Sequence, residues 1–351
     1  MTTMKDVANI TGLSVGTISN YINGKSVKNL NQDIIKNTIE ELGYKPNFAG
    51  KSLRTGKTKT IGILANTLSS HFISESCFVI EKELYNHGYN VIFCTSNNDL
   101  ETEREKLFYL ASSNVAIIIL IPVSHSETDI SCVGNIPTLV IDSNVEHQNC
   151  NAILFDDKES AYNATKYFYN NGHRKIAFLA GTKGHFTSSN RLEGYKKALN
   201  DFGIPYNEEY VTYADYDELK AEISTINLFS NENPPTAVLI ASNEMLIGFL
   251  LGLKAKKKRV PDDVSYITFD DTDYYSLLNI APTYVKQPKY DFGMRVYETL
   301  VEILNPNSKE KEPKIKGKEP KIKYVKTSLI IGESVRNLNC DSVEEVKISI
   351  F

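Results

Sequence analysis

Two short helical patterns separated by a glycine open the chain, and this feature constrains the fold more than any other. The first pattern repeats at three and four residues, as on one face of a helix, at Met4, Val7, Ala8 and Thr11. Gly12 then permits a sharp turn, because glycine adopts a positive φ without a steric penalty. The first helix is therefore expected to end at this turn, with a second helix directly behind it.

The second helix has start and stop signals of its own. Ser14 is a candidate N-cap, since its hydroxyl can accept a hydrogen bond from a free backbone N–H of the first turn. The helix is expected to run from Val15 to about Asn23 and to end at Gly24, with Ile18 and Ile22 facing inward. Two helices joined by a tight turn predict a helix-turn-helix, whose second helix enters the DNA major groove.

A third helix is expected over about residues 31–43, and strands and helices alternate from residue 60 onward. Apolar runs of strand length occupy residues 60–65, 90–95, 115–121, 137–142, 151–156, 175–180, 236–241 and 264–270. Amphipathic helical stretches between them include residues 76–87, 158–170, 191–201, 244–254 and 291–304. Continuous Val- and Ile-rich strands separated by helices predict two parallel sheets, each covered on both faces.

Charge is distributed unevenly along the chain. Residues 1–59 contain nine Lys or Arg against four Asp or Glu, a net charge of +5, so the remainder must carry −9 for the whole chain to reach −4. A basic head on an acidic body fits a protein that touches phosphates with one end only. A merely solvated basic terminus is the alternative.

Several function classes lack their sequence signals. No apolar run reaches transmembrane length, and no signal peptide pattern opens the chain. The five cysteines are scattered without CxxC spacing, which argues against a disulfide framework or a zinc site and suits a reducing cytoplasm. GxxxxGK, HExxH and GxSxG motifs are absent, and the six histidines show no ligand spacing, so most of them are expected at the surface or at helix caps. We expect no catalytic residues, no metal and no cofactor.

Two motifs in the first 54 residues have the spacing of a known family. KDVANITGLSVGTISNYING (5–24) resembles the pattern [KY]-D-V-A, then V-S-x-x-T-V-S-x-x-[VI]-N, with Leu13 and Ile18 as apolar equivalents. ELGYKPNFAGKSLR (41–54) resembles L-x-Y-x-P-[NS]-x-x-A-[RK]-x-L, with Gly50 in place of the Ala. The chain therefore resembles the LacI/GalR family of bacterial repressors. Further motifs, such as NRLEGYKKAL (190–199) and RVPDDVSYITFDD (259–271), extend the resemblance to about residue 335.

The resemblance implies how the head would contact DNA. Val15, Gly16 and Asn20 occupy the positions that touch base edges, and Asn20 can pair with adenine through two hydrogen bonds. Residues 47–53 would form a hinge helix in the minor groove, where Leu53 is wedged between base steps. The plainer alternatives are an exposed helical Asn20 and linker packing for Leu53. The remaining expected DNA contacts, several of them to phosphates, are Lys5, Ser14, Thr17, Ser19, Asn23, Tyr44, Asn47, Lys51, Ser52 and Arg54.

Two departures from the family pattern reduce these contacts. Gly16 offers no side-chain donor, and a helical glycine costs about 1 kcal/mol relative to Ala. Asn31-Gln32 replaces the Thr-Arg of the family, so one phosphate contact is expected to be lost. We therefore expect recognition to depend on Val15, Asn20 and Leu53, with little selection of guanine.

The resemblance also implies the architecture of the body, a periplasmic-binding-protein-like domain of two doubly wound parallel-sheet subdomains. The expected units are a helix-turn-helix domain (1–46), a hinge helix and linker (47–59) and an effector-binding and dimerisation domain (60–351). Within the last unit, the N-subdomain would comprise about 60–157 and 287–323, and the C-subdomain about 158–286 and 324–340. The chain would cross between them near 156–158, 285–288 and 323–325.

Candidate effector-binding residues lie where strands end, because ligands of open α/β sheets bind beyond the carboxyl ends of the strands. Arg191 begins an R-x-x-G-[FY] motif, the main effector contact of the family. Asp142 and Asp270 follow strands but could be helix N-caps, and Arg191 could lie on the surface. The full set is Ser69, His71, Phe72, Asp142, Arg191, Tyr216, Ser242, Asn243 and Asp270. Charged partners beside an aromatic face suit a neutral polyol.

Four further features are two departures from the family pattern, one basic run and one short repeat. Asn243 stands where the family prefers Asp, which alters either hydroxyl recognition or only a cap. Gly332 replaces the usual Arg of L-I-x-R-x-S, so the salt bridge expected of that Arg is in doubt. The run KAKKKR (254–259) is expected to end a helix, with an anion contact as the alternative. KEPKIK repeats at 311 and 318, which indicates a solvated insertion.

Together these features favour a transcriptional repressor whose affinity for operator DNA is controlled by a small molecule, a sugar or sugar derivative. The alternatives are a non-regulatory sugar-binding protein and a purine-responsive, corepressor-dependent member of the same family. Expected partners are pseudo-palindromic operator DNA, a carbohydrate effector, a second copy of the chain in a homodimer or tetramer, and a phosphocarrier co-regulator. The expected location is the cytoplasm, at the nucleoid and away from membranes.

Overall fold

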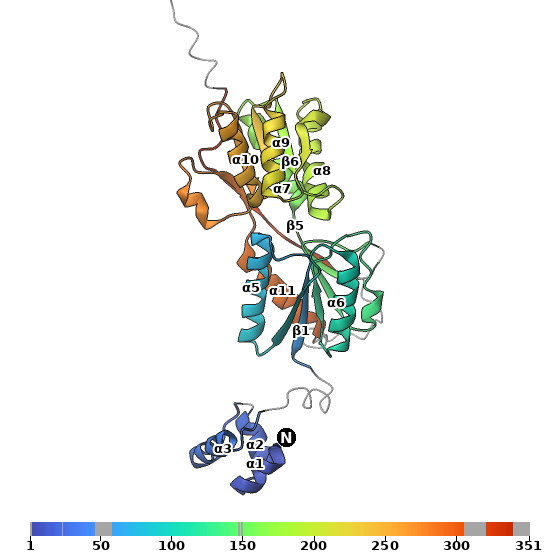
Figure 1. The fold of residues 1–351 in the computed structure, drawn as a ribbon, viewed down its shortest axis with the longest axis vertical. Coiled ribbons are helices and arrows are strands. Elements are labelled where there is room, and N and C mark those ends of the chain that lie inside the picture. Colours follow the sequence, from blue (N-terminus) through green and yellow to red (C-terminus); the bar gives the residue numbers. More distant parts are fainter. Residues whose placement is uncertain are drawn as a thin grey trace, which may run out of the picture. The chain divides into compact units, whose positions relative to one another are not determined.

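The chain divides into two units, a head over Met1–Thr58 and a body over Lys59–Phe351 (Figure 1). The computed structural model describes residues 2–22, 24–45, 58–146, 148, 150–304 and 321–339. The predicted hinge helix, with Leu53, lies outside the described residues. None of the described helices is long and apolar enough to cross a membrane.

The head contains the three helices that its sequence predicts: α1 (Met4–Thr11), α2 (Val15–Ile22) and α3 (Asn29–Glu41). Gly12 follows α1 with φ of 67°, in the left-handed region that the tight turn requires. Ser14 caps α2, because its Oγ accepts a hydrogen bond from the backbone N–H of Thr17 (3.1 Å). The predicted helix-turn-helix is thus confirmed, with its turn and cap.

The core of the head is formed by one apolar stripe from each helix. Val7 and Ala8 of α1, Ile18 of α2 and Ile35 of α3 are buried. The preceding Ile34 is 41 % exposed, because successive side chains of a helix lie 100° apart around its axis. Because the core uses only one face of α2, the opposite face of this helix is free for other contacts.

The first half of the body is a six-stranded sheet with the order β11-β5-β4-β3-β1-β2, all of its strands parallel. Helices cover both faces, which buries the sheet and explains its continuous apolar strands. The strands are β1 (Thr60–Ala65), β2 (Asn90–Thr95), β3 (Ile118–Leu120), β4 (Thr138–Ile141), β5 (Asn151–Phe155) and β11 (Ile322–Val325), and the helices are α5 (His71–Asn86), α6 (Leu100–Ser112), η1 (Ser131–Val133) and α11 (Lys289–Leu304).

The second half is a six-stranded sheet with the order β12-β10-β9-β8-β6-β7. Its strands are parallel except β12, which pairs antiparallel with β10. The strands are β6 (Ile176–Ala180), β7 (Val211–Tyr213), β8 (Ala237–Ile240), β9 (Ser265–Phe269), β10 (Thr283–Lys286) and β12 (Ser328–Ile330). The helices are α7 (Asp157–Asn170), α8 (Phe186–Asp201), η2 (Glu208–Tyr210), α9 (Glu218–Leu228), α10 (Asn243–Ala255) and η3 (Asp273–Leu277). Two doubly wound parallel-sheet subdomains were predicted, and the architecture is confirmed.

Sequence patterns were less successful at the sheet edges and the helix starts. The short strands β7, β10, β11 and β12 were not predicted, because three or four residues of mixed polarity leave no periodic signal. Helices α5 and α8 begin at His71 and Phe186, each five residues before the predicted start, so each has an additional first turn. In α5 that turn is capped by Ser70, whose Oγ accepts from the N–H of Ile73 (3.5 Å).

Three connections join the halves, between β5 and α7, between β10 and α11, and between β11 and β12. The first two lie where the sequence placed them. The third lies at residues 326–327 and not at 323–325, because Lys323, Tyr324 and Val325 still pair with β5 in the first sheet.

The structure explains why Gly332 departs from the family pattern. A Cβ at this position would overlap the carbonyl oxygens of Ala281 and Pro282. The backbone N–H of Gly332 donates to Thr283 Oγ1 (3.0 Å), so the loop is held close to β10. This close approach of two backbones requires glycine, and no arginine could be accommodated without moving the loop.

Candidate functional site

The outer face of α2 presents the side chains expected to read bases. Val15 is 40 % exposed, and Gly16 and Asn20 are exposed beside it, while Ile18 faces the core. Lys5 on α1 is also exposed. The outer face of α2 therefore carries one apolar and one amide side chain, the two that are predicted to contact bases.

Other expected DNA contacts have structural partners within the head. The hydroxyls of Ser14 and Thr17 lie 2.9 Å apart and bond to each other. Tyr44 is only 7 % exposed and packs in the core of the head, so the main role of its ring is to stabilise the fold. Ser19 is half-buried. The remaining candidates, Asn23, Asn47, Lys51, Ser52, Leu53 and Arg54, lie outside the described residues.

Replacing Gly16 by Ala is expected to stabilise the head by about 1 kcal/mol, the difference in helix propensity between the two residues. A Cβ at Gly16 would contact only Ser14 Oγ, at 3.6 Å, so space does not oppose the change. Hydrogen exchange of the α2 amides in the full chain measures the effect. Gly12→Ala is the matched control, and it should destabilise the head because φ is positive there. Faster exchange in Gly16→Ala would contradict the prediction.

In the body, polar residues converge at the carboxyl ends of the second sheet and of β4. Asp142 directly follows β4, Asp270 follows β9, and Asn243 opens α10. Both aspartates have positive φ, 57° and 69°, and neither caps a helix, so that alternative is wrong. Ser242 caps α10 instead, since its Oγ accepts from the N–H of Met245 (3.4 Å).

Arg191 lies at the centre of these residues and is only 3 % exposed, so it is not a surface arginine. Its Nε donates to Asp157 Oδ1 (2.7 Å), and its Nη1 donates to the carbonyl oxygen of Ala241. The guanidinium lies 3.8 Å from the centre of the Phe269 ring, a cation–π contact. Sequence reasoning missed Asp157, which holds the guanidinium in place, because a carboxylate opening a helix is an ordinary feature.

Three carboxylates surround this one guanidinium. Burial raises the pKa of Asp142 and Asp157, although Arg191 opposes the shift. Burial also raises the pKa of Asp270 to about 7. The cluster holds more potential negative than positive charge, so removing these carboxylates from water favours their protonated forms.

Several buried atoms of the cluster lack a hydrogen-bond partner within the described residues. They are Asp142 Oδ1, the Tyr216 hydroxyl, Asn243 Oδ1 and His185 Nδ1. Buried polar groups are nearly always paired, and a group left unpaired costs about 1–3 kcal/mol. These atoms could therefore pair with a polar ligand.

Two histidines belong to the same region, although the sequence suggested surface or capping roles. His185 lies 6.0 Å from the Tyr216 ring and makes no capping hydrogen bond, and burial lowers its pKa to about 4. His125 lies 5.8 Å from the Phe186 ring at the start of α8. His173, by contrast, has a structural role, since its Nδ1 is hydrogen-bonded to Thr236 Oγ1 (2.9 Å). No local pattern distinguishes these histidines in the sequence.

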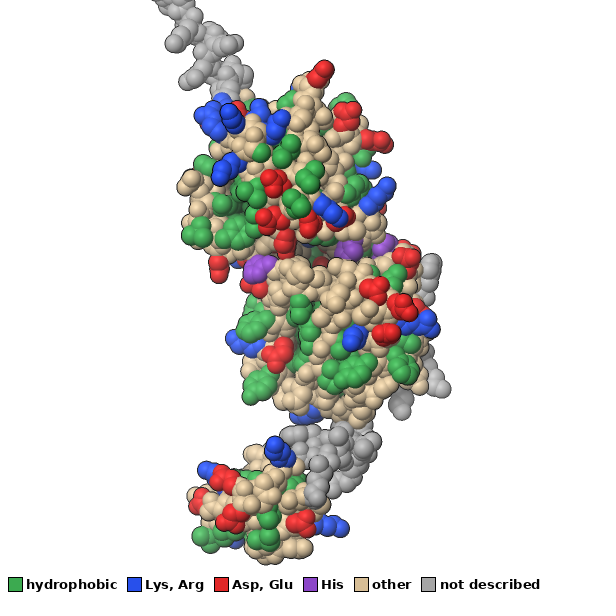
Figure 2. Space-filling model, in the orientation of Figure 1, with side chains coloured by type: hydrophobic (Ala, Val, Ile, Leu, Met, Phe, Trp, Pro, Cys, Tyr) green, Lys and Arg blue, Asp and Glu red, His purple; other side chains and the backbone are tan. Residues whose placement is uncertain are grey.

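Contacts between the halves lie beside the cluster, and Figure 2 shows histidines and carboxylates gathered where the halves meet. The backbone N–H of His71, in the first half, donates to Glu244 Oε1 in the second (2.9 Å). Lys289 pairs with Glu75 of the first half and with Asp271 of the second, its Nζ 3.1 Å from the Asp271 carbonyl oxygen. These contacts join the two halves of the body beside the cluster.

Two other candidate effector-binding residues of the first half, Ser69 and Phe72, lie in different surroundings. Ser69 Oγ lies 3.0 Å from Thr67 Oγ1 in the loop before α5. The Phe72 ring packs edge-on to Phe155, with centroids 5.6 Å apart, and is 7 % exposed. Phe72 is therefore mainly a core residue, with little of its ring left for a ligand.

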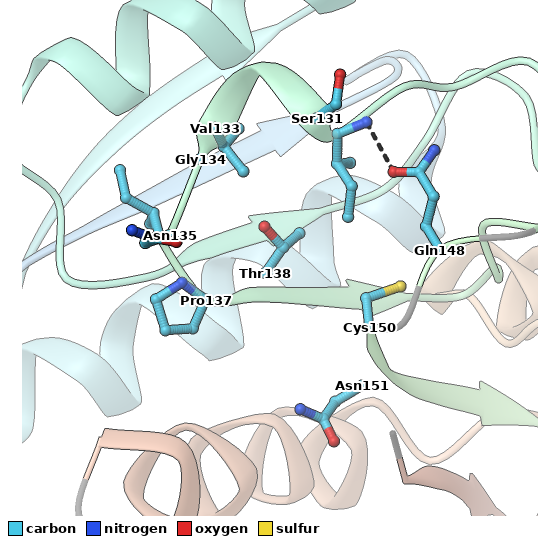
Figure 3. Close-up of a pocket in the computed structure, with 11 residues that line it drawn as sticks. Ser131, Val133, Gly134, Asn135, Pro137, Thr138, Gln148, Cys150 and Asn151 are labelled. Atoms are coloured by element: carbon cyan, nitrogen blue, oxygen red, sulfur yellow. Dashed lines mark hydrogen bonds between the residues drawn. The ribbon is translucent and has the colours of Figure 1, made fainter. Parts of the chain in front are cut away.

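A cavity of about 430 Å³ lies elsewhere, at the amino ends of β4 and β5 (Figure 3). Thr138 and Asn151 line it, and the N–H of Ile130 donates to Gln148 Oε1 (3.0 Å) at its edge. Ligands of parallel sheets bind at the opposite, carboxyl ends of the strands. This cavity is therefore separate from the polar cluster. Among the described residues, no group of three His, Cys, Asp or Glu is placed to hold a metal ion.

Comparison with known proteins places both units. Residues 3–47 match the family model for bacterial regulatory proteins of the lacI family, and residues 165–335 match the periplasmic binding protein-like domain. The repressor PurR of Vibrio campbellii is 30 % identical over 315 residues, 89 % of this chain and 94 % of that protein. The ribose operon repressor of Haemophilus influenzae is 29 % identical over 310 residues, 88 % of this chain and 93 % of that protein.

Solved structures show the same fold. The lac repressor dimer bound to operator and the anti-inducer ONPF has a TM-score of 0.82 and 22 % identity, covering 95 % of this chain and 99 % of that one. The transcriptional regulator CelR in complex with cellobiose has a TM-score of 0.70 and 25 % identity, covering 95 % of this chain and 100 % of that one.

Proposed function

The chain belongs to the LacI family of DNA-binding transcriptional regulators, and from that premise we propose that its operator affinity is controlled by a neutral polyhydroxyl compound, a sugar, bound at the Arg191 cluster. The head would present Val15, Gly16 and Asn20 to operator bases. A non-regulatory binding protein is not favoured, since the relatives are repressors.

One observation supports this ligand class above others: the unpartnered atoms of the cluster lie beside a surplus of carboxylates. Asn243 Oδ1 accepts hydrogen bonds, and Asp142 Oδ1 accepts when ionised and can donate when protonated. Sugar hydroxyls both donate and accept, so they can pair with either form. A phosphate or carboxylate on the ligand would instead meet Asp142, Asp157 and Asp270. The names of two similar proteins, a ribose operon repressor and a cellobiose complex, agree with a sugar.

A thermal-shift screen of the full chain tests the ligand class. Neutral pentoses, hexoses and cellobiose form one arm, and sugar acids, sugar phosphates and nucleobases form the others. A ligand at about 100 times its Kd adds about 2.7 kcal/mol to the free energy of unfolding. Stabilisation by a neutral sugar alone is expected. Stabilisation only by an anion or a nucleobase would contradict the proposal.

Selection of DNA from a random pool by the full chain tests the regulatory role. We expect a pseudo-palindrome, because paired heads read half-sites related by two-fold symmetry. Few guanines are expected opposite Val15 and Gly16, and the sugar found in the screen should change the affinity for the selected DNA. Strong guanine selection at those positions, or no response to the sugar, would count against this function.

Lys289→Met is expected to weaken effector binding about tenfold, equivalent to about 1.4 kcal/mol. Lys289 is 14 % exposed on its side chain and joins Glu75 to Asp271 across the boundary between the halves, so it favours the arrangement in which they enclose a ligand. Calorimetric titration with the sugar from the screen gives the affinity. The matched control is Lys158→Met, which removes a pair with Glu193 inside the second half. Equal effects of the two changes would contradict this role of Lys289.

We further propose that the chain forms a homodimer, since a pseudo-palindrome requires two heads. Phe78 and Tyr85 on α5 are 65 % and 70 % exposed, beside the edge strand β2 with its exposed Phe93. Phe78→Glu is expected to shift the mass measured by light scattering toward the monomer. Phe108→Glu on α6, where Phe108 is also 65 % exposed, is the control and should leave the mass unchanged. Cytoplasmic location, absence of catalysis and a phosphocarrier partner stay predictions from the family.

A further inference from the structure

A second cavity lies in the second half of the body, at the end of α10 remote from the Arg191 cluster. Asn243 opens α10 beside the cluster, and the helix ends at Ala255, next to this cavity of about 490 Å³. A thirteen-residue helix is about 20 Å long, so the two sites occupy opposite ends of one rigid element. The volume lies within the range of small-molecule sites.

The walls of this cavity are apolar and come from three separate segments. Leu253, in the last turns of α10, and Tyr266 of β9 are 2 % and 1 % exposed and form buried parts of the lining. Leu278 and Ile280, which follow η3, line it from the loop that leads to β10. These side chains would remove the apolar body of a ligand from water.

The rim of the same cavity is cationic. Lys254, Lys257, Lys258 and Arg259 line it, and Figure 2 shows Lys and Arg side chains gathered at this end of the second half. Arg259 is paired with Asp262 and Asp263, at 3.4 and 3.5 Å. Within the described parts of the chain, the three lysines have no carboxylate in ion-pair distance.

The partial negative charge at the C-terminal end of α10 does not by itself account for these three lysines. Cations near a helix C-terminus offset the partial negative charge of its last carbonyls, which accounts for a lysine there. Stabilisation of the helix end does not explain why three unpaired lysines border an apolar cavity. The neighbouring Lys256 does not line the cavity, and its Nζ is hydrogen-bonded to Ser230 Oγ (3.0 Å). Unpaired cations around apolar walls are complementary to an anion that has an apolar body.

We propose that this cavity binds a small anionic amphiphile, a molecule with one acidic group and a short acyl or ring body, as a second ligand of the regulator. The acidic group would lie among Lys254, Lys257 and Lys258, and the apolar body against Leu253 and Ile280. The site is independent of the sugar site, and its existence does not depend on the sugar proposal.

A tryptophan reporter tests this site directly, because the chain contains no Trp. Leu278→Trp in the full chain places a single indole at the cavity, and Leu219→Trp, at a 63 % exposed position of α9, is the control reporter. The probes are octanoate, octyl phosphate, octanol and octylammonium, which share one chain and differ in charge. Both anions are expected to change the emission of Leu278→Trp alone, with at least about tenfold tighter binding than octanol.

Paired lysine variants in the reporter background show whether the charge matters at this place. Lys257→Ala is expected to weaken anion binding about five- to tenfold, and Lys256→Ala, with the same loss of charge one residue away, less than twofold. Equal binding of octanol or octylammonium, equal effects of the two alanine variants, or no emission change would overturn the proposal. Binding seen only after removal of residues 340–351 would also overturn it, since the occupant would then be this chain itself.

Discussion

Arg191→Ala is expected to abolish stabilisation of the body by its effector and to lower the free energy of unfolding by roughly 3–5 kcal/mol. Removing one partner of a buried ion pair leaves an uncompensated charge, and costs of this size are typical. Here Asp157, Asp142 and Asp270 would all lose their counter-ion. Chemical denaturation and the thermal-shift screen measure the two effects, and selected operator DNA should still bind, because the head folds around its own core.

Arg174→Ala is the matched control for this change. Arg174 also lies over an aromatic ring, that of Tyr169, at 4.0 Å, but it is exposed at the surface of the same half. Its loss is expected to cost less than about 1 kcal/mol, as for an exposed cation–π contact. If Arg191→Ala does not fold, Arg191→Lys keeps the charge without the guanidinium fork and should still lose effector binding. A full effector response in either variant would contradict the site.

Asp270→Asn is expected to stabilise the ligand-free protein at pH 8 by about 2–4 kcal/mol and to have little effect near pH 4. Burial raises the pKa of Asp270 to about 7 in the folded chain, whereas an unfolded Asp titrates near 4. The stability associated with its proton is therefore present below pH 4 and is lost as the pH rises to about 7. The Asn amide resembles the protonated carboxyl and does not ionise.

Denaturant unfolding of parent and variant between pH 4 and pH 8 measures this difference. Asp273→Asn, an exposed residue of η3, is the matched control for the change of side chain. The difference between Asp270→Asn and the parent should grow steadily in favour of the variant with rising pH. A difference independent of pH would show that Asp270 does not retain its proton on folding.

Much of the fold could be predicted because its signals are local. The turn at Gly12, the cap at Ser14 and the period of α1 and α2 depend on neighbours within four residues, and the buried strands of both sheets depend on continuous apolar runs. The edge strands β7 and β12 were not predicted, because three residues contain no such local signal. Three residues become a strand only when a distant partner pairs with them, as β10 does with β12.

The candidate site likewise contains some residues that the sequence identified and others that it did not. Asp142, Asn243 and Asp270 were chosen because strand ends of parallel sheets share an edge, and Arg191 because it begins the R-x-x-G-[FY] motif of the family. The structure does bring them together. Tyr216 joins them through its unpartnered hydroxyl. The orienting Asp157, the buried His185 and the bridging Lys289 were not recognisable, because their roles come from contacts between segments 18 or more residues apart.

The sequence by itself determined that this chain has a helix-turn-helix head, a body of two α/β halves and candidate polar residues at strand ends, because these features follow from local periodicity and turn chemistry. Only the tertiary structure decided which of those residues share one buried cluster, and which lie in a core, as Phe72 and Tyr44 do. It also revealed the cationic rim beside Leu253 and Ile280. Burial and charge balance depend on all the surrounding segments at once, and no single stretch of sequence contains them.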